Sequence, residues 1–376
     1  MSHEKPTSRR DFLRGKSAGR ALLDAARVLV DRTVEALPGD SPAKTNPAFP
    51  RSPLSQEPRL HTSRRAMACD FAIEHHAADG PEAAAAVIEA LALVEQLEDQ
   101  LSIYRESTEV SAINRTAAEQ AVEVEPRLFA LLELCGWLYG STGGAFDVTS
   151  GPLSRTWGFL KREGRLPSHG EISVAMAMVG FDKVDLDAAT RTIRFRQPGV
   201  EINFNSVGKG YALDRVAELL AERGVTDYLC HGGRSSVLAR GRDRNGRDRG
   251  WAIAVPHPLE PDKHLGEIIL SDNALGTSGS GTQFFEHEGR RYGHLLDPRT
   301  GWPVEGIYTA TAVAKTAAEA DALATAFYVM GPGGAAEYCA LHANVGAVLV
   351  CPGVARGAVD VHALNLADGR WLPSGM

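Results

Sequence analysis

The sequence predicts an α+β protein, with one large domain of mixed helices and strands behind a poorly ordered N-terminal tail. Of the 376 residues, 44% are hydrophobic and 23% are charged, which is typical of a globular chain and not of a disordered one. Helical and strand-like segments are mixed along the chain without the regular succession of βαβ units. Because no internal repeat of about 20–50 residues is visible, a repeat architecture is not expected.

The first 60 residues differ in composition from the rest. They hold eleven Lys or Arg and seven Asp or Glu, a net charge of +4, whereas the whole chain carries −7. Six of the twenty prolines fall between Pro38 and Pro58. This indicates an extended linker, because proline lacks an N–H donor and interrupts helices. We therefore expect a basic, Pro-rich tail over residues 1–60 and a folded domain over residues 61–376.

Within the tail, Ser8–Arg14 resembles a degenerate twin-arginine export signal. Such a signal needs an apolar run of about 7–15 residues after the arginines. The longest runs that follow, Ala21–Leu23 and Val28–Val30, have only three residues each. The spacing of their apolar residues favours a short amphipathic helix instead. The sequence thus slightly favours a cytoplasmic location over export to the periplasm.

Five segments of the folded part have helical patterns. Pro81–Leu101 is rich in Ala, Leu and Glu, and its Val and Leu residues recur along one stripe, which predicts an amphipathic helix. Three others end at glycine, the usual residue after a helix. They are Arg127–Tyr139, Lys209–Arg223 and Ala317–Met330, and a short fifth helix is expected at Ala335–His342.

Strands are expected between these helices, in short runs of β-branched, aromatic and other apolar residues. The first, Phe71–His75, leads into a turn at Ala77–Gly80. The remaining strand patterns are Thr192–Arg196, Trp251–Val255, Tyr308–Ala314 and Ala347–Val350.

Several function classes are disfavoured by what the sequence lacks. A net charge of −7 and a pI near 6.0 argue against nucleic acid as the main partner. No apolar stretch reaches the roughly 18–20 residues of a transmembrane helix. The phosphate-binding loop, the dinucleotide-binding glycine motif, the serine-hydrolase elbow and the HExxH zinc motif are all absent. The five cysteines form no CxxC pair and are interpreted as small core residues.

One helical segment, Ala320–Met330, carries a carboxylate where an apolar residue would be expected. Asp321 and Thr325 are four residues apart, so they lie on the same helix face. A buried carboxylate must be paired, hydrogen-bonded or bound to a metal. Carboxylate, hydroxyl and carbonyl oxygens suit Mg²⁺ or Ca²⁺. The alternative is a capping Asp, with Thr325 bonded back to a helix carbonyl.

Lys209 lies between Gly208 and Gly210, where a strand is expected to turn into a helix. The glycines allow a sharp turn and a close approach of the backbone to a ligand. A cation at a helix N-terminus opposes the helix dipole unless an anion is also present. Lys209 therefore indicates a phosphate or carboxylate partner, the alternative being a solvated lysine in an ordinary turn.

His294 is expected at the end of a strand, just before a turn. Asp297, with Pro298 after it, has typical turn chemistry, so a structural role suffices to explain this carboxylate. His294 can titrate near neutral pH, which suits a general base, although a lone histidine is more often structural. Upstream, Thr277–Gly279 supplies hydroxyls and a glycine that suit phosphate contacts; seen alone, it is only a polar loop.

Taken in order, these segments resemble the ApbE family, the FAD:protein FMN transferases, over about residues 64–365. Met67 begins the first strand of the pattern. The matching segments are Leu101–Tyr104 with Ser107–Asn114, Gly144–Leu153 with Trp157–Phe159, Asn203–Asp214, His231–Gly233, Thr277–Gly279, His294–Gly301 and Ala320–Thr325. One such motif is weak, and it is their common order that makes the resemblance specific.

The resemblance implies a T-fold-like domain that uses FAD and Mg²⁺. Its implied activity is transfer of FMN from FAD to a Thr or Ser hydroxyl of a target flavoprotein, with release of AMP. It further implies that Asp321 and Thr325 bind the metal with the backbone carbonyls of Ser206 and Ala324, Asp321 being essential for catalysis. His294 would be the general base. The implied FAD-binding residues are Met67, Tyr104, Ala145, Phe146, Asp147, Asn203, Lys209, Thr277, Ser278, Gly279 and Leu295.

The chain also departs from the family pattern. The family usually has Met-Gly-Thr where this chain has Met67–Cys69, an acidic residue at Asn203, Asp or Asn at Arg234 and often Ser at Ala324. Asn203 and Arg234 bear on nucleotide affinity, which leaves open an FAD-binding or delivery protein without turnover. An Mg²⁺-dependent FAD pyrophosphatase that forms FMN and AMP also stays open, because the same site would serve that reaction with water in place of the acceptor hydroxyl.

Overall fold

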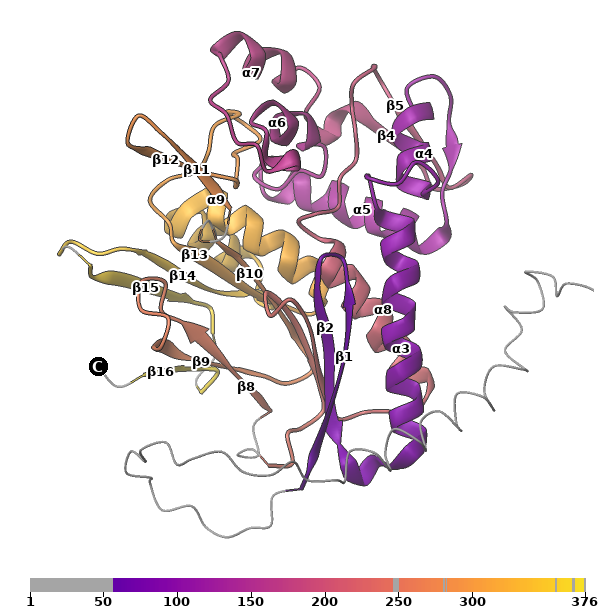
Figure 1. Ribbon diagram of the computed structural model, residues 1–376, viewed down its shortest axis with the longest axis vertical. Coiled ribbons are helices and arrows are strands. Elements are labelled where there is room, and N and C mark those ends of the chain that lie inside the picture. Colours follow the sequence, from indigo (N-terminus) through magenta and orange to yellow (C-terminus); the bar gives the residue numbers. More distant parts are fainter. Residues whose placement is uncertain are drawn as a thin grey trace, which may run out of the picture.

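The computed structural model describes residues 57–245, 250–279, 281, 283–355, 357–366 and 369–374. The predicted tail, with its twin-arginine-like motif, lies outside these residues except for its last four. An antiparallel sheet of eight strands organises the described part (Figure 1). In spatial order its strands are β1 (Arg59–Ala66), β2 (Cys69–His76), β6 (Tyr228–Gly232), β7 (Ser236–Arg240), β10 (Ala274–Gly279), β13 (Thr309–Ala314), β14 (Gly346–Pro352) and β15 (Val359–Leu364).

Three long helices cover one face of this sheet: α3 (Gly80–Leu101), α8 (Gly208–Glu222) and α9 (Ala317–Leu341) (Figure 1). Their buried residues and the inner face of the sheet form the main hydrophobic core. α9 is bent at Gly331, where φ is 73°, so its two halves correspond to the two helices predicted on either side of this glycine. The 25-residue helix is buried along most of its first half, as the apolar sequence predicts.

The opposite face is covered by a small sheet of β16 (Trp371–Pro373), β9 (His264–Leu270) and β8 (Trp251–Pro256). Trp251 and Ile268 of this sheet pack against Val237 and Val348 of the large one. The middle strands of the large sheet are therefore buried on both faces. This explains why β14 is continuously apolar and does not alternate with polar residues.

Shorter elements gather at one end of the sheet (Figure 1). Helices here are α4 (Glu109–Thr116), α5 (Pro126–Ser141), α6 (Gly151–Thr156) and α7 (His169–Met176), with 3₁₀ turns η2 (Phe159–Lys161) and η3 (Phe181–Lys183); a further turn, η1 (Ala77–Asp79), precedes α3. Small sheets are formed by β3 (Val122–Glu123), β5 (Thr192–Phe195) and β4 (Val184–Asp187), and by the hairpin β11 (Phe284–His287) and β12 (Arg290–Gly293).

The predicted α+β class is confirmed, and the five helices and five strands that were predicted by residue range fall on elements of the matching type. Three local predictions were wrong. Met67 does not begin a strand, because Met67 and Ala68 form the two-residue turn between β1 and β2, with φ of 48° and 60°. Residues 277–279 are not a loop; they form the end of β10 and pair with β13.

The third wrong prediction is the strand before Lys209. Residues 201–204 there have no regular secondary structure and join no sheet. The Asn114 side chain occupies both backbone groups of Ile202, donating to its carbonyl and accepting from its N–H. The N–H of Asn203 donates to the Val148 carbonyl. A side chain and a loop thus take the bonds that a neighbouring strand would have taken.

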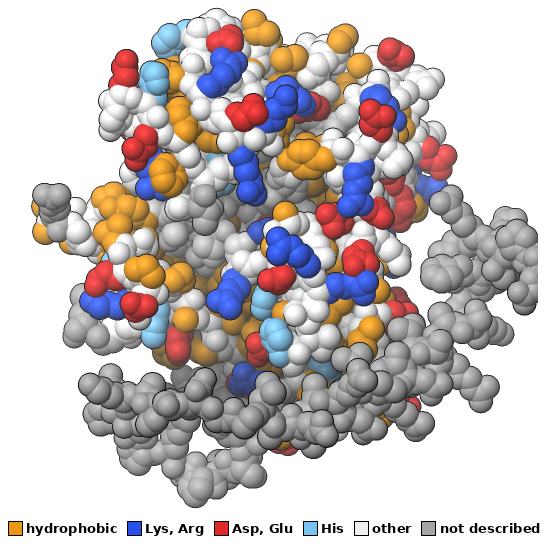
Figure 2. All heavy atoms as spheres, in the orientation of Figure 1, with side chains coloured by type: hydrophobic (Ala, Val, Ile, Leu, Met, Phe, Trp, Pro, Cys, Tyr) orange, Lys and Arg blue, Asp and Glu red, His pale blue; other side chains and the backbone are white. Residues whose placement is uncertain are grey.

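Within the described residues, no helix is both long enough and apolar enough to span a membrane. Acidic and basic side chains are interspersed over the face shown in Figure 2. The five cysteines form no disulfide, and three of them are fully buried, as expected for core residues.

Candidate functional site

The start of α8, the first turns of α9 and the strand β10 meet at backbone contact distance. A Cβ atom on Gly210 would lie 2.1 Å from the Ala317 carbonyl oxygen, and one on Gly276 would lie 2.5 Å from the Ala320 backbone. Only glycine fits at either position, since no real Cβ approaches backbone atoms so closely. These two contacts bring Asp321 beside the first turn of α8 and the edge of β10.

The Asp321 carboxylate is almost completely buried, and its two oxygens differ. Oδ2 accepts hydrogen bonds from the Gly210 N–H at 2.7 Å and from the Ser236 hydroxyl at 2.8 Å. Within the described part of the chain, no hydrogen bond reaches Oδ1. Burial raises the pKa of Asp321 to about 7, while the nearby charge of Lys209 and the two hydrogen bonds oppose that rise. Oδ1 is therefore the oxygen available to a cation.

The same arrangement leaves the Ser206 carbonyl available. In a continuing helix the Gly210 N–H would donate to the residue four positions earlier, which is Ser206. Here that N–H donates to Asp321 instead. No backbone hydrogen bond from the described residues reaches the Ser206 oxygen. Asp321 thus caps α8 from outside, which differs from the expectation that it would cap its own helix.

Thr325 lies one turn after Asp321 and faces β10. Its hydroxyl lies 3.0 Å from the Ser278 hydroxyl and donates to the Asp321 carbonyl at 3.4 Å, the back-bonding expected of a mid-helix threonine. Thr277 points to the neighbouring strand, where its hydroxyl lies 3.0 Å from that of Thr311. The hydroxyl of Ser278 therefore contacts Thr325, which in turn contacts Asp321, whereas the hydroxyl of Thr277 points away from them.

Lys209 lies at the N-terminus of α8, as predicted, and is its second residue. Its ammonium group donates to the Ser235 hydroxyl, and its charge acts on both Asp321 and Cys69. Ser235 is the last residue of the β6–β7 turn and Ser236 the first of β7, so this connection supplies one hydroxyl to the cation and one to the carboxylate. The site therefore holds a lysine and a carboxylate whose polar partners come from neighbouring residues.

His294 follows β12 directly and is half-buried. Its Nδ1 lies 3.0 Å from the Gln283 carbonyl, which can only accept, so Nδ1 carries the proton and Nε2 keeps its lone pair. Burial lowers the pKa of His294, and the hydrogen bond to Gln283 opposes this only in part. The ring is thus neutral near pH 7, with Nε2 free to accept a proton.

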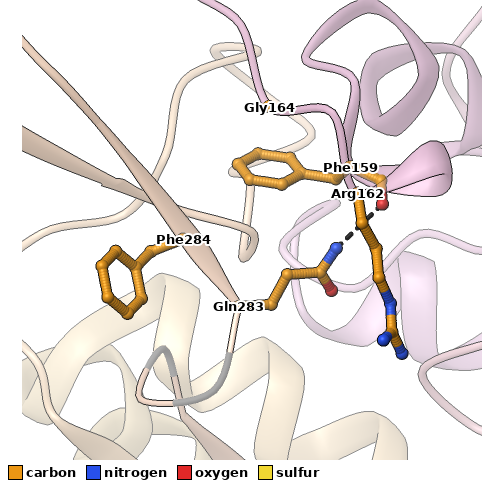
Figure 3. Close-up of a pocket in the computed structure, with 5 residues that line it drawn as sticks. All are labelled: Phe159, Arg162, Gly164, Gln283 and Phe284. Atoms are coloured by element: carbon orange, nitrogen blue, oxygen red, sulfur yellow. Dashed lines mark hydrogen bonds between the residues drawn. The ribbon is translucent and has the colours of Figure 1, made fainter.

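A pocket of about 330 Å³ lies beside His294. Phe159, Arg162, Gly164, Gln283 and Phe284 line it (Figure 3). The Gln283 amide donates to the Phe159 carbonyl at 2.8 Å, and the Phe159 ring meets the His294 ring edge-on, with centroids 6.4 Å apart. Gln283 and Phe284 point to opposite sides of their strand in Figure 3. The pocket is therefore lined by two residues, Phe159 and Gln283, that contact His294.

Asp147 forms a second buried acidic position. Its Oδ1 accepts from the Thr149 N–H and hydroxyl at 2.8 and 2.7 Å, whereas no partner within the described residues reaches its buried Oδ2. Burial raises the pKa of Asp147 to about 6. The Asn203 N–H donates to the Val148 carbonyl, so the two predicted FAD-binding segments are adjacent. An unpartnered buried carboxylate oxygen is typical of a ligand-binding position.

The other predicted binding residues are placed less uniformly. Ala145 and Phe146 lie in the main core with 0% and 1% of their surface exposed, whereas the Tyr104 side chain is 67% exposed. Met67 and Leu295 are partly buried against that core. None of these five makes a side-chain hydrogen bond to the group around Asp321, and their FAD contacts stay predictions.

Residues 67–349 match the sequence profile of the ApbE family. The chain belongs to this family. It is 32% identical to the FAD:protein FMN transferase of Vibrio cholerae over 64% of this chain and 71% of the relative, and 30% identical to that of Haemophilus influenzae over 65% and 72%.

Solved structures of ApbE proteins are also similar. The apo form of the Pseudomonas stutzeri flavinyl transferase ApbE superposes with a TM-score of 0.74 at 28% identity, covering 86% of this chain and all of the other. The flavin transferase ApbE from Vibrio cholerae gives a TM-score of 0.72 at 25% identity, covering 82% and 97%. The predicted resemblance to the ApbE family is confirmed.

The oxygen atoms that could bind a metal at this ApbE-family site fit a hard cation that takes few protein ligands. No group of three or more His, Cys, Asp or Glu side chains among the described residues could hold a metal. The available oxygens are one carboxylate, the Thr325 hydroxyl and the Ser206 carbonyl. This set suits Mg²⁺, which usually binds one or two carboxylates together with substrate phosphates, and it does not suit zinc.

Sequence reasoning missed Ser235, Ser236 and Gln283. The two serines follow the Gly232–Gly233 pair, where a hairpin turn signal could have drawn attention to them. Gln283 acts through its backbone carbonyl, so its residue type carries no signal. The predicted Ala324 carbonyl lies in mid-helix, where carbonyls accept from the residue four positions later, and its role stays a prediction.

Proposed function

We propose that this chain transfers the FMN part of FAD to a Thr or Ser hydroxyl of a partner flavoprotein, in a reaction that depends on Mg²⁺. The observation that carries the proposal is the pairing at Gly210. Its N–H binds Oδ2 of Asp321, and both Asp321 Oδ1 and the Ser206 carbonyl are left without a hydrogen-bond partner among the described residues. The names of the curated relatives support the same reaction class.

Mg²⁺ would be held by Asp321, Thr325 and the Ser206 carbonyl. When bound, it would neutralise charge on the pyrophosphate of FAD. Lys209 adds a second positive charge at the same helix N-terminus, where the helix dipole also favours an anion. The conflict between a lysine and the helix dipole is removed when phosphate binds there.

The acceptor hydroxyl oxygen attacks the phosphorus of the FMN phosphate. The bond between this phosphorus and the bridging oxygen of the pyrophosphate breaks, and AMP leaves with that oxygen. The proton of the hydroxyl passes to Nε2 of His294, which is unprotonated because burial lowers the pKa of the ring. Gln283 keeps the proton of the neutral imidazole on Nδ1 and so presents Nε2 as the base.

The acceptor protein reaches His294 through the pocket beside Phe159. The pocket is lined by Phe284, which is 42% exposed, and by Arg162, which is also exposed. Arg162 makes no ion pair with any described residue. An aromatic side chain and an unpaired cation at a rim are typical of a protein contact surface.

The proposal is tested by mixing the full chain with FAD, Mg²⁺ and a recombinant flavoprotein acceptor, then measuring AMP release and the intact mass of the acceptor. A mass gain of one FMN unit that requires Mg²⁺ and is lost in Asp321→Asn and His294→Ala supports transfer. Unlabelled acceptor with stoichiometric AMP would instead identify a pyrophosphatase. FAD that is bound and unchanged would identify a binding protein.

A further inference from the structure

Lys209 and Asp321 carry opposite charges close together but make no ion pair. Gly210, the residue after Lys209, donates its N–H to Oδ2 of Asp321 at 2.7 Å. The Cα atom of Lys209 is two covalent bonds from that nitrogen, so its four-carbon side chain is long enough to reach the carboxylate. Burial raises the pKa of Asp321 and the positive charge of Lys209 opposes that rise, yet among the described residues no ion pair joins the two side chains. The ammonium group is therefore held elsewhere.

The hydroxyl of Ser235 holds this ammonium group. Nζ of Lys209 donates to Oγ of Ser235, the one hydrogen bond that it makes within the described part of the chain. The next residue, Ser236, donates its hydroxyl to Oδ2 of Asp321 at 2.8 Å. Since successive Cα atoms lie about 3.8 Å apart, the two opposite charges are bound to neighbouring hydroxyls. They are near each other, but each has a neutral partner of its own.

The β6–β7 turn that carries Ser235 is fixed by the strands on both sides of it. The Gly233 N–H donates to the Asp70 carbonyl of β2 at 2.9 Å. The Ser235 carbonyl accepts the Thr277 N–H of β10 at 2.7 Å. Gly233 and Arg234 have left-handed backbones, with φ of 61° and 62°, a conformation that is uncommon for any residue but glycine. The turn therefore has one defined geometry, which places the Ser235 hydroxyl beside the start of α8.

Oδ1 of Asp321 is an oxygen that two positive groups can bind, a metal ion and the ammonium group of Lys209. The metal ion would take it as a ligand, and the ammonium group would use it as a hydrogen-bond acceptor. Opposite charges that are partly removed from water attract each other strongly, so a lysine without another partner would fold onto the carboxylate. An ion pair there would neutralise Asp321 and occupy the position of the metal ion.

We propose that Ser235 is a positioning residue: by holding the ammonium group of Lys209, it keeps Oδ1 of Asp321 free for a divalent cation. The inference rests on the proposed function, because that cation is the Mg²⁺ of flavin transfer. Ser235 gives the cation no ligand and acts through Lys209. An ammonium group has three donors, so the two that Ser235 does not use remain available for phosphate oxygens. The same hydrogen bond thus serves both the metal ion and the phosphate.

The test measures binding of Mn²⁺ to the full chain without FAD, by electron paramagnetic resonance of the free ion. Ser235→Ala should weaken this binding at least five-fold, although it removes no oxygen that we assign to the cation. Ser235→Thr keeps a hydroxyl at this position and should bind Mn²⁺ within two-fold of the wild type. An unchanged Mn²⁺ affinity in Ser235→Ala would overturn the proposal.

A Lys209→Met background separates positioning of the ammonium group from an effect on the turn. Without the lysine no ammonium group competes for Oδ1, so adding Ser235→Ala to Lys209→Met should change the Mn²⁺ affinity less than two-fold. The double variant should therefore bind Mn²⁺ more tightly than Ser235→Ala alone. A serine needed only for the structure of the turn would weaken binding equally in both backgrounds, and that result would overturn the proposal.

Failure of the proposed function would give a different pattern of Mn²⁺ affinities. A wild type that binds no Mn²⁺, or that binds it equally well after Asp321→Asn, would exclude the cation site, and with it both this inference and the Mg²⁺ dependence of flavin transfer. Wild-type binding that is lost in Asp321→Asn but is unaffected by Ser235→Ala would overturn only the role of Ser235.

Discussion

Asp214 and Asp321 cap each other's helices. The Asp214 carboxylate, on α8, accepts the N–H groups of Ala317 and Ala318 at the start of α9, each at 2.8 Å. Asp321, on α9, accepts the N–H of Gly210 at the start of α8. Each carboxylate thus satisfies donors that a helix N-terminus leaves unpaired, and each lies at the positive end of the other helix dipole. The two helices that carry the site are therefore locked in one relative position.

Asp214→Ala should lower the free energy of unfolding by roughly 1–3 kcal/mol, because two buried N–H groups lose their acceptor. Asp214→Asn should cost about half as much, since its amide oxygen still accepts one of them. Urea unfolding of both variants, followed by circular dichroism, measures the difference. Equal losses for Ala and Asn would contradict the capping role.

Asp214 also gives stability a pH dependence. Burial raises its pKa to about 6, above the usual value of 3.8, while the two N–H groups oppose the rise. The folded chain therefore holds the proton more tightly than the unfolded chain does. The stability from this group is fully present below about pH 4 and is lost as the pH rises to about 6. In the Asn variant that part of the pH dependence should disappear, measured as urea midpoints between pH 4 and 7.

His294 should control the acid limb of the pH–rate profile for flavin transfer. A general base must be unprotonated, and burial lowers the pKa of His294 below its usual 6.5. The rate kcat/KM should therefore rise with pH below about 6.5 and be flat from pH 7 to 8. His294→Ala should lower kcat by roughly 10²–10⁴-fold and remove this limb. His287→Ala, on the same hairpin, is the control, and a persistent limb in His294→Ala would exclude His294 as the base.

Asp321→Asn should separate cation binding from folding. The asparagine oxygen still accepts from Gly210 and Ser236, so the free energy of unfolding should change little, while the missing charge should weaken binding of Mn²⁺, used in place of Mg²⁺, by at least ten-fold. Electron paramagnetic resonance of free Mn²⁺ measures this. Thr325→Val should also weaken binding, and Thr325→Ser should restore it. Wild-type affinity for Mn²⁺ in Asp321→Asn would show that the Asp321 carboxylate does not bind the cation.

How much of this site the sequence predicts depends on how local each signal is. Asp321 and Lys209 stand out because each contradicts its immediate surroundings: a carboxylate in an apolar helix and a cation at a helix N-terminus. Ser236 gives no such signal, since its partner Asp321 is 85 positions away in the sequence. The reciprocal capping is equally invisible, because Asp214 and Ala317 are 103 positions apart.

The strand β10 shows the same limit for the fold. Its sequence is small and polar where it meets α9, so neither strand propensity nor alternation predicts it. The reason appears only in three dimensions, where Gly276 must leave room for the α9 backbone. By contrast, β14 is predicted well, because burial between two layers makes it continuously apolar.

Gly276→Ala should destabilise the fold and displace α9. The new Cβ would lie 2.5 Å from the Ala320 backbone, a contact that only backbone movement can relieve. We expect a loss of more than about 2 kcal/mol. Gly140→Ala is the matched control, because that helical glycine has no atom within 4 Å of the new Cβ, and it should stabilise by roughly 0.5–1 kcal/mol. Thermal unfolding of both variants measures these changes in stability. Similar unfolding midpoints for the two variants would contradict the close contact at Gly276.

The ring of Phe284 should contribute to binding of the acceptor protein but not of FAD. It is 42% exposed at the pocket beside His294, and the Arg291 guanidinium lies 3.5 Å from its centroid. If docking buries the rest of the ring, Phe284→Ala loses roughly 1 kcal/mol, which is about a five-fold increase in KM for the acceptor. The KM for FAD should not change, since nothing places this ring near Asp321 or Lys209. Val361→Ala, on β15 and 39% exposed, is the control for loss of an apolar surface side chain. An unchanged KM for the acceptor in Phe284→Ala would show that the acceptor does not dock on this hairpin. An equal increase of that KM in Val361→Ala would lead to the same conclusion.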